Sequence, residues 1–287
     1  VFEKLHAYNS VLGDLVIQGT FDYEDQLKWN AKIAAQTFDI SQLTLSKDNP
    51  LPASDISGPI NSSGKYSLLD HTWSVNLNNA DLYGHVMQYP LNVVGDLAIN
   101  DKWHLSSDGL NVNALQSRLF IQGEVEKNWS LNGELTVPDL SLWQQDASGT
   151  INADINVSGE NEHPDIEVAL TATDLEFQTL ELETMSVNGH YKPFDNQAFN
   201  AQMDLYNFKY QDLELNDVTL AAKGGLAAQS LKLGSTGELT LNSQIVSQYD
   251  QKLHRIEAQI KSLSLASKLG QVDLDAPLEG SYLIDKQ

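Results

Sequence analysis

The chain has 287 residues, of which 41% are hydrophobic, and its 39 acidic and 17 basic side chains give a formal net charge of −22. A surface this acidic repels phosphate backbones and anionic headgroups, which argues against nucleic-acid binding and electrostatic adhesion to a membrane. The absence of cysteine excludes disulfides, thiolate catalysis and cysteine-ligated zinc.

Short runs in which every second residue is apolar follow one another along the chain. In chain order they lie at 11–23, 27–35, 91–99, 119–125, 129–137, 151–157, 166–172, 239–245, 256–260 and 272–278. Side chains on a strand point alternately to opposite faces, so each run predicts a strand with one apolar and one polar face. Turn formers such as Gly, Asn, Asp and Pro separate the runs, and we therefore predict an all-β fold.

The segment 47–66 breaks this pattern, because prolines and glycines interrupt it, and we expect an irregular excursion from the sheet there. Nothing approaches 18 consecutive apolar residues, the length needed for a helix that spans a bilayer. The chain starts at Val1 and stops directly after a strand-like run. We expect one continuous elongated β domain over 1–287, as a fragment of a longer chain.

An internal repeat with an offset of 33 residues links two segments. Leu175, Phe177, Leu180, Leu182, Met185 and Val187 match Phe208, Tyr210, Leu213, Leu215, Val218 and Leu220. In both copies the apolar residues switch between odd-numbered and even-numbered positions at the same two points. The first switch follows Phe177 (Tyr210), and the second follows Leu182 (Leu215). A slip of one residue moves a side chain to the other face, so each slip predicts a corner or bulge. A repeated strand-corner-strand unit is typical of a solenoid-like sheet.

Motifs of catalysis or metal binding are not apparent. The seven histidines are scattered, without metal-ligand spacing, and Asp273 and Asp275 lie on the polar side of a strand. No G-x-S-x-G elbow or phosphate loop is present. We expect no catalytic residues, no metal and no cofactor, and we do not expect an enzyme.

A series of short elements between Tyr89 and Gly189 resembles a known family. The elements are Pro90-Leu91 with Gly95-Asp96-Leu97, Trp103-His104-Leu105, Leu115-x-x-Arg118-Leu119-x-Ile121-x-Gly123, Trp129-Ser130-Leu131, Gly133-x-Leu135, Pro138-Asp139-Leu140, Gly149-Thr150-Ile151 with Val157-Ser158-Gly159, and Pro164-Asp165-Ile166 with Asp174-Leu175. Their order and spacing resemble the middle region of the TamB family, subunits of the translocation and assembly module within the AsmA-like, bridge-like lipid transfer group. Ser117 stands where the family's N-R-L-x-V-x-G element has Asn.

The resemblance implies an elongated β-sheet folded over lengthwise, a "β-taco" or half-pipe with an apolar groove. It implies a place in the periplasm of a Gram-negative bacterium, with an N-terminal inner-membrane helix outside this chain. It also implies contact with a TamA-like outer-membrane barrel through a C-terminal part outside this chain. The family is implicated in outer-membrane biogenesis and in phospholipid movement.

Our first hypothesis is that the apolar face lines a groove for phospholipid acyl chains. The predicted lining consists of Leu119, Ile121, Leu135, Val137, Ile151, Ile155, Val157, Ile166, Val168, Leu170, Phe177, Leu180, Leu182, Val187, Leu213 and Leu215. An alternative is a chaperone-like surface that pairs open strand edges with nascent outer-membrane proteins such as autotransporters. A further alternative is a β-solenoid adhesin or passenger domain, in which the same residues form a closed core.

Overall fold

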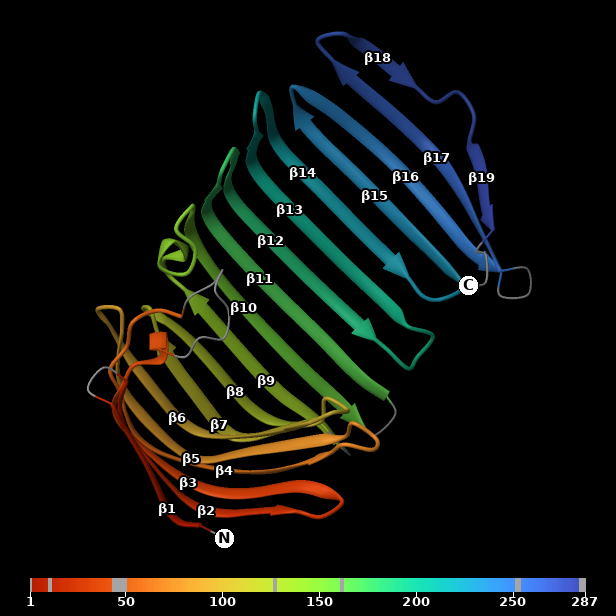
Figure 1. Ribbon diagram of the computed structural model, residues 1–287. Helices are drawn as coiled ribbons and strands as arrows, with labels where there is room; N and C mark the ends of the chain where they lie inside the picture. The colour runs from red at the N-terminus through yellow and green to blue at the C-terminus, as the bar shows by residue number, and fades with distance from the viewer. Residues whose placement is uncertain are drawn as a thin grey trace. The chain divides into compact units, whose positions relative to one another are not determined.

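The computed structural model describes residues 2–9, 12–42, 51–125, 128–160, 163–250 and 254–283. These residues form nineteen strands and two short 3-10 helices (Figure 1), which confirms the predicted all-β fold. None of the helices in this part of the chain has the length and hydrophobicity needed to cross a membrane. The chain divides into an N-terminal unit, Val1–Val137, and a C-terminal unit, Pro138–Gln287. Whether they act as one continuous domain stays a prediction.

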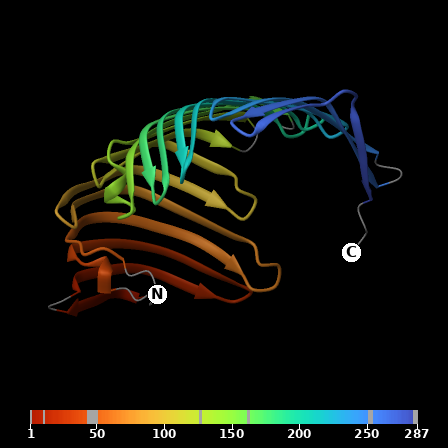
Figure 2. The same ribbon diagram turned by 90° about the horizontal axis from the view of Figure 1, so that it is seen from above.

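The N-terminal unit is an antiparallel sheet in which each strand pairs with the next in the chain. Figure 2 shows that its strands, in red to yellow, are bowed along their length. The 3-10 helix η1 (Ile40–Gln42) follows the third strand. The strands are β1 (Phe2–Asn9), β2 (Gly13–Tyr23), β3 (Gln26–Phe38), β4 (Ile56–Ser67), β5 (Trp73–Val86), β6 (Tyr89–Asn100), β7 (Leu105–Ala114), β8 (Ser117–Val125) and β9 (Asn128–Val137).

The C-terminal unit begins with the 3-10 helix η2 (Leu140–Leu142) and continues as a second run of antiparallel neighbours. At its far end, β17 pairs with both β18 and β19. The strands are β10 (Ala147–Glu160), β11 (His163–Phe177), β12 (Leu180–Lys192), β13 (Ala198–Tyr210), β14 (Leu213–Gly224), β15 (Ala228–Gly237), β16 (Leu239–Asp250), β17 (Arg255–Ser267), β18 (Gly270–Asp273) and β19 (Leu278–Leu283).

The sheets are open and bury little of their surface. The accessible surface of the 31.7-kDa chain is 18563 Å². Even two separate compact proteins of half that mass would together expose only about 14,700 Å². Extensive contacts between the described elements join strands that pair in a sheet, or β10 to η2. An accessible surface this large indicates that much of the apolar face of each unit is open to solvent.

Part of the predicted excursion over 47–66 is wrong. Residues 43–50 lie outside the described residues, but Ile56–Ser67 forms strand β4, which pairs with β3 along its length. The ladder to β5 is irregular between Ser57 and Asn61, and Pro59, which has no N–H to donate, lies in that gap. Gly58 has φ +120, and a Cβ there would lie 2.0 Å from the backbone oxygen of Asp81. The strand therefore continues through Gly58 and Pro59, which the sequence suggested would break it, because a bulge accommodates them.

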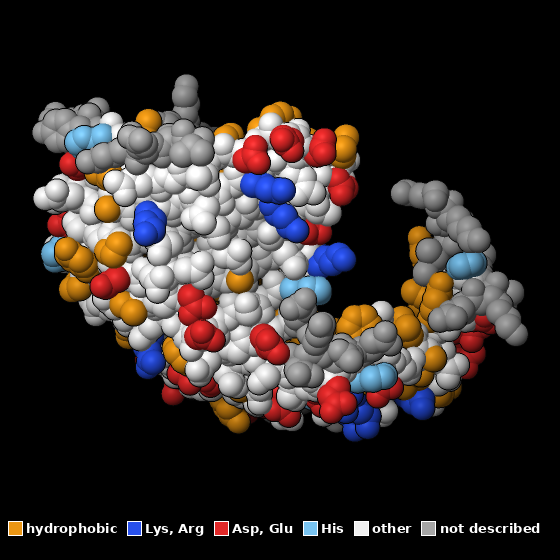
Figure 3. Space-filling view, turned by 90° about the horizontal axis from the view of Figure 1, so that it is seen from below, with side chains coloured by type: hydrophobic (Ala, Val, Ile, Leu, Met, Phe, Trp, Pro, Cys, Tyr) orange, Lys and Arg blue, Asp and Glu red, His pale blue; other side chains and the backbone are white. Residues whose placement is uncertain are grey.

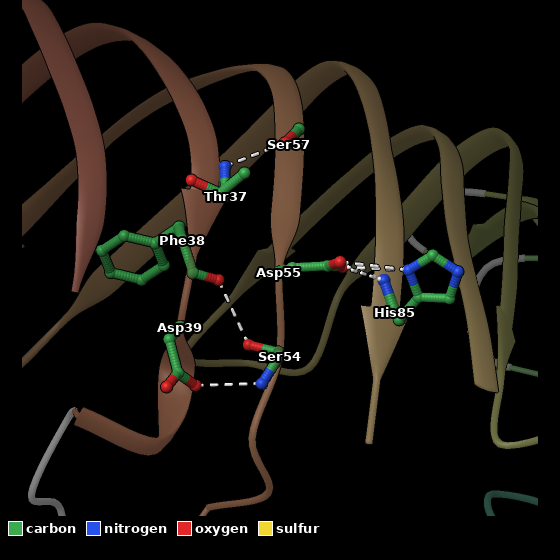
Figure 4. A network of polar contacts seen from close by, with 7 residues as sticks. All are labelled: Thr37, Phe38, Asp39, Ser54, Asp55, Ser57 and His85. Atoms are coloured by element: carbon green, nitrogen blue, oxygen red, sulfur yellow. Dashed lines mark hydrogen bonds and ion pairs between the residues drawn. The ribbon is translucent and has the colours of Figure 1, made fainter. Parts of the chain in front are cut away.

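A network around Asp39 fixes the connection between β3 and β4 (Figure 4). The Asp39 carboxylate accepts hydrogen bonds from the backbone N–H of Ser54 at 2.9 Å and of Ser41 at 3.1 Å. Burial raises the pKa of Asp39, but these hydrogen bonds, with those from the Ser41 hydroxyl and Gln42, outweigh it and lower the pKa overall. Nearby, Asp55 accepts a hydrogen bond from the His85 backbone N–H at 2.5 Å and contacts the imidazole Nδ1 at 3.1 Å.

The parity slips of the internal repeat coincide with interruptions of the strands, the first with hairpin turns and the second with a line of unpaired residues across the sheet. The first parity slip of each copy is a tight turn between strands, with Gln178 (φ 56) and Gln211 (φ 54) in the left-handed region. The second slip interrupts the ladders at the same level on successive strands, and it is a bulge with a register shift in the β10–β11 and β14–β15 ladders. The residues along this bulge line are Gly149 of β10, Asp174 of β11, Glu183 of β12, Asn207 of β13 and Asn216 of β14.

Candidate apolar surface

The register of the C-terminal unit aligns its apolar residues into rows of cross-strand neighbours. One row consists of Ile155, Val168, Gly189, Ala201, Ala222, Leu231, Ile245 and Ile260, one residue from each strand from β10 to β17. A second consists of Ala153, Leu170, Val187, Met203, Leu220 and Leu233, and a third of Ile151, Ala172, Met185, Leu205 and Val218. Hairpin geometry therefore turns alternation along each strand into apolar rows across the sheet.

Two further rows lie beyond the bulge line. Leu175, Leu182, Phe208 and Leu215 form one, and Phe177, Leu180, Tyr210 and Leu213 form the other. Asp174 and Asn207 adopt left-handed φ values of 51 and 50 at the crossing. Each such irregularity removes one residue from the alternation, so the apolar residues on either side of it can share a face.

The N-terminal unit contains similar rows. Leu82, Val93, Val112, Leu119 and Leu135 are successive neighbours from β5 to β9. Another row contains Phe21, Trp29, Gly64, Val75, Ile99, Leu105, Val125 and Trp129.

In that second row the indole of Trp29 lies over Gly64. A Cβ on Gly64 would lie 2.4 Å from Cζ2 of Trp29, and the indole Nε1 donates a hydrogen bond to the Ser62 hydroxyl at 3.0 Å. A glycine is needed at this position because the ring and the Ser74 carbonyl oxygen, which would lie 2.4 Å from such a Cβ, occupy the space of a side chain.

Most of the predicted lining residues take places in these rows. Leu119 and Leu135 are neighbours in the N-terminal unit, and Ile121 lies between Leu110 and Gly133. In the C-terminal unit, Val157 and Ile166 are cross-strand partners at one end of β10 and β11. The others are Ile151, Ile155, Val168, Leu170, Val187, Phe177, Leu180, Leu182, Leu213 and Leu215, in the rows described above.

The exposure of the predicted residues varies along the rows. Val137, Val157, Leu182 and Leu215 are buried, whereas Ile155 and Phe177 are 43% and 44% exposed. An uncovered sheet face produces this mixture, because each side chain is shielded only by its neighbours in the same layer. Contact of these residues with lipid stays a prediction.

Sequence reasoning missed several members of the rows. Met203, Leu205, Leu231, Leu233 and Ile260 were not among the predicted lining residues, although each is the direct neighbour of another row member. The internal repeat contained a signal for some of the rest, because it marked Met185, Phe208, Tyr210, Val218 and Leu220 as equivalent apolar positions. The sequence did not give the register between paired strands, which decides which residues are neighbours in a row.

The opposite face of the C-terminal sheet is polar. Asp154, Ala169, Asn188, Gln202, Ala221, Lys232, Gln244 and Ser262 form a row of cross-strand neighbours between two apolar rows. Figure 3 shows hydrophobic side chains gathered on one side of the strands near the C-terminus and charged ones on the other. The hydrogen bond and charge of Lys268 lower the pKa of Glu238, and those of Glu238 raise the pKa of Lys268.

Comparison with known proteins places this two-faced sheet in a family. Residues 4–287 match the family model described as the N-terminal domain of TamB. The chain belongs to this family. The match extends the resemblance from Tyr89–Gly189 to both flanks.

Two curated relatives agree with this assignment. The "Translocation and assembly module subunit TamB" of Haemophilus influenzae is 21% identical over 96% of the chain. A protein of Buchnera aphidicola described as uncharacterized is 22% identical over 75% of the chain. The matched regions cover 21% and 22% of these relatives, so the chain spans about a fifth of their length. No solved structure matches the chain.

Proposed function

We propose that this chain is a section of a conduit for phospholipid acyl chains, with the uncovered apolar face as its lining. The observation that carries the proposal is the alignment of apolar side chains into rows that cross as many as eight successive strands. An uncovered apolar face this long does not help an acidic protein to stay in solution, and such faces mark binding surfaces.

The geometry of the rows suits a hydrocarbon chain. Strands are about 4.8 Å apart, so the row from Ile155 to Ile260 runs about 34 Å across the sheet. Each methylene removed from water contributes about 0.8 kcal/mol, so a few buried carbons retain a tail. The rows are built from Leu, Ile, Val, Ala and Met, with few polar groups to fix a ligand at one place. Such a lining holds tails while it lets them slide.

The wider setting is part of the same proposal and rests on the family. As in other TamB-like proteins, the chain would be a subunit of a translocation and assembly module that supports outer-membrane biogenesis. We place it in the periplasm of a Gram-negative bacterium, in a protein anchored in the inner membrane through a helix outside this chain. A TamA-like outer-membrane barrel is its expected partner at the other end.

A second candidate function uses the sheet edges instead of the face. Open sheets present unpaired backbone groups on their outermost strands, and nascent outer-membrane proteins can add strands there. In that case replacing apolar residues on the face would impair function less than altering the edge strands. The third alternative, an adhesin with a closed core, gains no support from sheets that are open in both units.

Native mass spectrometry of the purified chain, combined with lipid extraction, separates these alternatives. The conduit predicts copurifying phospholipids that are released by substitutions on the apolar face. The chaperone alternative predicts no retained lipid and binding of unfolded outer-membrane protein. A preparation free of lipid that also fails to take up added phospholipid would contradict the conduit.

A further inference from the structure

Three lysines come together on the polar face of the C-terminal unit. Lys223 of β14 pairs with Ser230 of β15. Lys232 follows Ser230 by two residues on β15, so its side chain is on the same face as those of Ser230 and Lys223. Lys232 pairs with Gln244 of β16, which in turn pairs with Ser262 of β17. A register shift at this point of the β16–β17 ladder leaves Lys261 as an extra residue beside Ser262, and it lines the same hollow as Lys223. The chain has only 17 basic residues against 39 acidic ones, so a group of three on four adjacent strands is unusual for its composition.

None of these three lysines forms an ion pair with the described residues. Other lysines of the same unit do: Lys192 lies 3.4 Å from Asp165, and Lys209 lies 3.3 Å from Glu214. Diagonal neighbours on paired strands are about 7–8 Å apart, so Lys223 and Lys232 repel each other. An anion between them would relieve the repulsion.

A hollow of about 620 Å³ adjoins the lysines, and both Lys223 and Lys261 line it. Asn200 and Gln248 add amide groups to the same wall. Gln229 also borders the hollow, but both ends of its amide are already hydrogen-bonded, the nitrogen to the Gly225 carbonyl at 3.0 Å and the oxygen to the Ser247 hydroxyl at 2.8 Å. The hollow is larger than an inorganic ion needs, and it combines positive charge with neutral hydrogen-bonding groups.

No acidic residue is among the described residues that line this hollow. Glu257 and Glu279 line the adjoining hollow that shares Lys261. Glu257 is paired with Arg255, and Glu279 accepts a hydrogen bond from Gln259 at 2.9 Å. With no carboxylate in its own wall, the hollow keeps the positive charge of Lys223 and Lys261.

We propose that this hollow binds a phosphate ester through Lys223 and Lys261, with Lys232 adding charge from the neighbouring position. A phosphate has several acceptor oxygens and can take hydrogen bonds from more than one ammonium group. The amides of Asn200 and Gln248 suit the hydroxyls of the alcohol attached to it. The phosphate belongs either to a free ester or to the headgroup of a lipid. The site lies on the face opposite the apolar rows, so it does not depend on the proposed conduit.

Binding of two probes to the complete chain tests the proposal. The probes are glycerol 3-phosphate and dihexanoylphosphatidylglycerol below its micelle concentration, with glycerol as the uncharged reference, and calorimetry or NMR titration is the readout. We expect saturable binding of at least one phosphate probe and none of glycerol. The double variant Lys223→Gln/Lys261→Gln should weaken it on the order of tenfold, the value of a charged hydrogen bond. Lys223→Arg/Lys261→Arg should retain most of it.

Lys102→Gln is the matched control, because Lys102 is exposed in a turn of the N-terminal unit and has no ion pair among the described residues. Circular dichroism confirms that each variant is folded. Equal affinity for the two phosphate probes assigns the site to free esters, and tighter binding of the lipid assigns it to headgroups. Absence of saturable binding overturns the proposal, as does an equal loss in Lys102→Gln, because general charge attraction would then explain the effect.

Discussion

Replacement of Gly189 by leucine should obstruct the apolar surface without harming the fold. Gly189 lies in the longest row, between Val168 and Ala201. A Cβ added there would meet only the Cβ of Val168, at 4.0 Å. The position therefore has room for a side chain and does not need a left-handed backbone. Glycine within a strand costs about 0.5–1 kcal/mol relative to alanine, so Gly189→Leu should leave stability unchanged or raise it.

The size of the effect on binding follows from the volume that the new side chain fills. A leucine adds four carbon atoms where an acyl chain would otherwise lie. Displacing about four methylenes at about 0.8 kcal/mol each removes at most about 3 kcal/mol of contact, which is on the order of a hundredfold in affinity. Some of this loss is recovered because a flexible tail shifts to neighbouring rows, so a tenfold loss is the smallest effect that we expect.

Displacement of a fluorescent fatty-acyl probe measures the affinity, and urea unfolding measures the stability. Asn188→Leu is the matched control, because Asn188 is the adjacent residue and its row lies on the polar face. The control should bind the probe like the parent protein. If Gly189→Leu is folded and binds equally well, or if Asn188→Leu weakens binding as much, the apolar face is not where tails lie.

Three further predictions concern stability and are checked by urea or thermal unfolding. Gly64→Val should lower the free energy of unfolding by about 1–3 kcal/mol, because its side chain must displace the Trp29 indole, whereas Gly280→Val, with open space around it, should cost little. Asn207→Val should cost about 1–2 kcal/mol through its left-handed φ of 50 and the loss of the hydrogen bond to Glu183, while Asn207→Gly should retain most of the stability. Asp39→Asn should cost about 1 kcal/mol at neutral pH. Because folding lowers the pKa of Asp39, the difference in unfolding free energy between the parent protein and Asp39→Asn should shrink as the pH falls below 3.8. A difference that persists at low pH would refute the assigned role of the carboxylate.

The elements of this fold were predictable from alternation, and the corners from the repeat. The run from Ile151 to Val157 lies within strand β10, and the slips after Phe177 and Leu182 are a turn and an interruption of the ladder. These features are local, because a side chain's face depends only on its parity and the residues beside it. Strand β4 escaped prediction because Gly58 and Pro59 usually end strands, and only a bulge against a neighbouring strand accommodates them here.

The candidate surfaces were only partly predictable. Parity assigns Ile155, Val168 and Ile245 to apolar faces, but only the register makes them members of one row. Register depends on turns between strands and on bulges such as Asn216, which the sequence does not specify clearly. The lysine group shows the same limit, because Lys223, Lys232 and Lys261 are separated in the chain and meet only through the pairing of β14 to β17.

Photocrosslinking in living cells tests the conduit most directly. A photoreactive residue replaces Ile155 or Val168, which are cross-strand partners in the longest apolar row, within the full-length protein. The same residue placed at Asn156 or Glu167, the adjacent pair on the polar face, serves as the control. We expect phospholipid adducts at Ile155 and Val168 and few at Asn156 and Glu167. An absence of lipid adducts at the apolar pair, or equal adduct yields at both pairs, would contradict the claim that the apolar face contacts lipid.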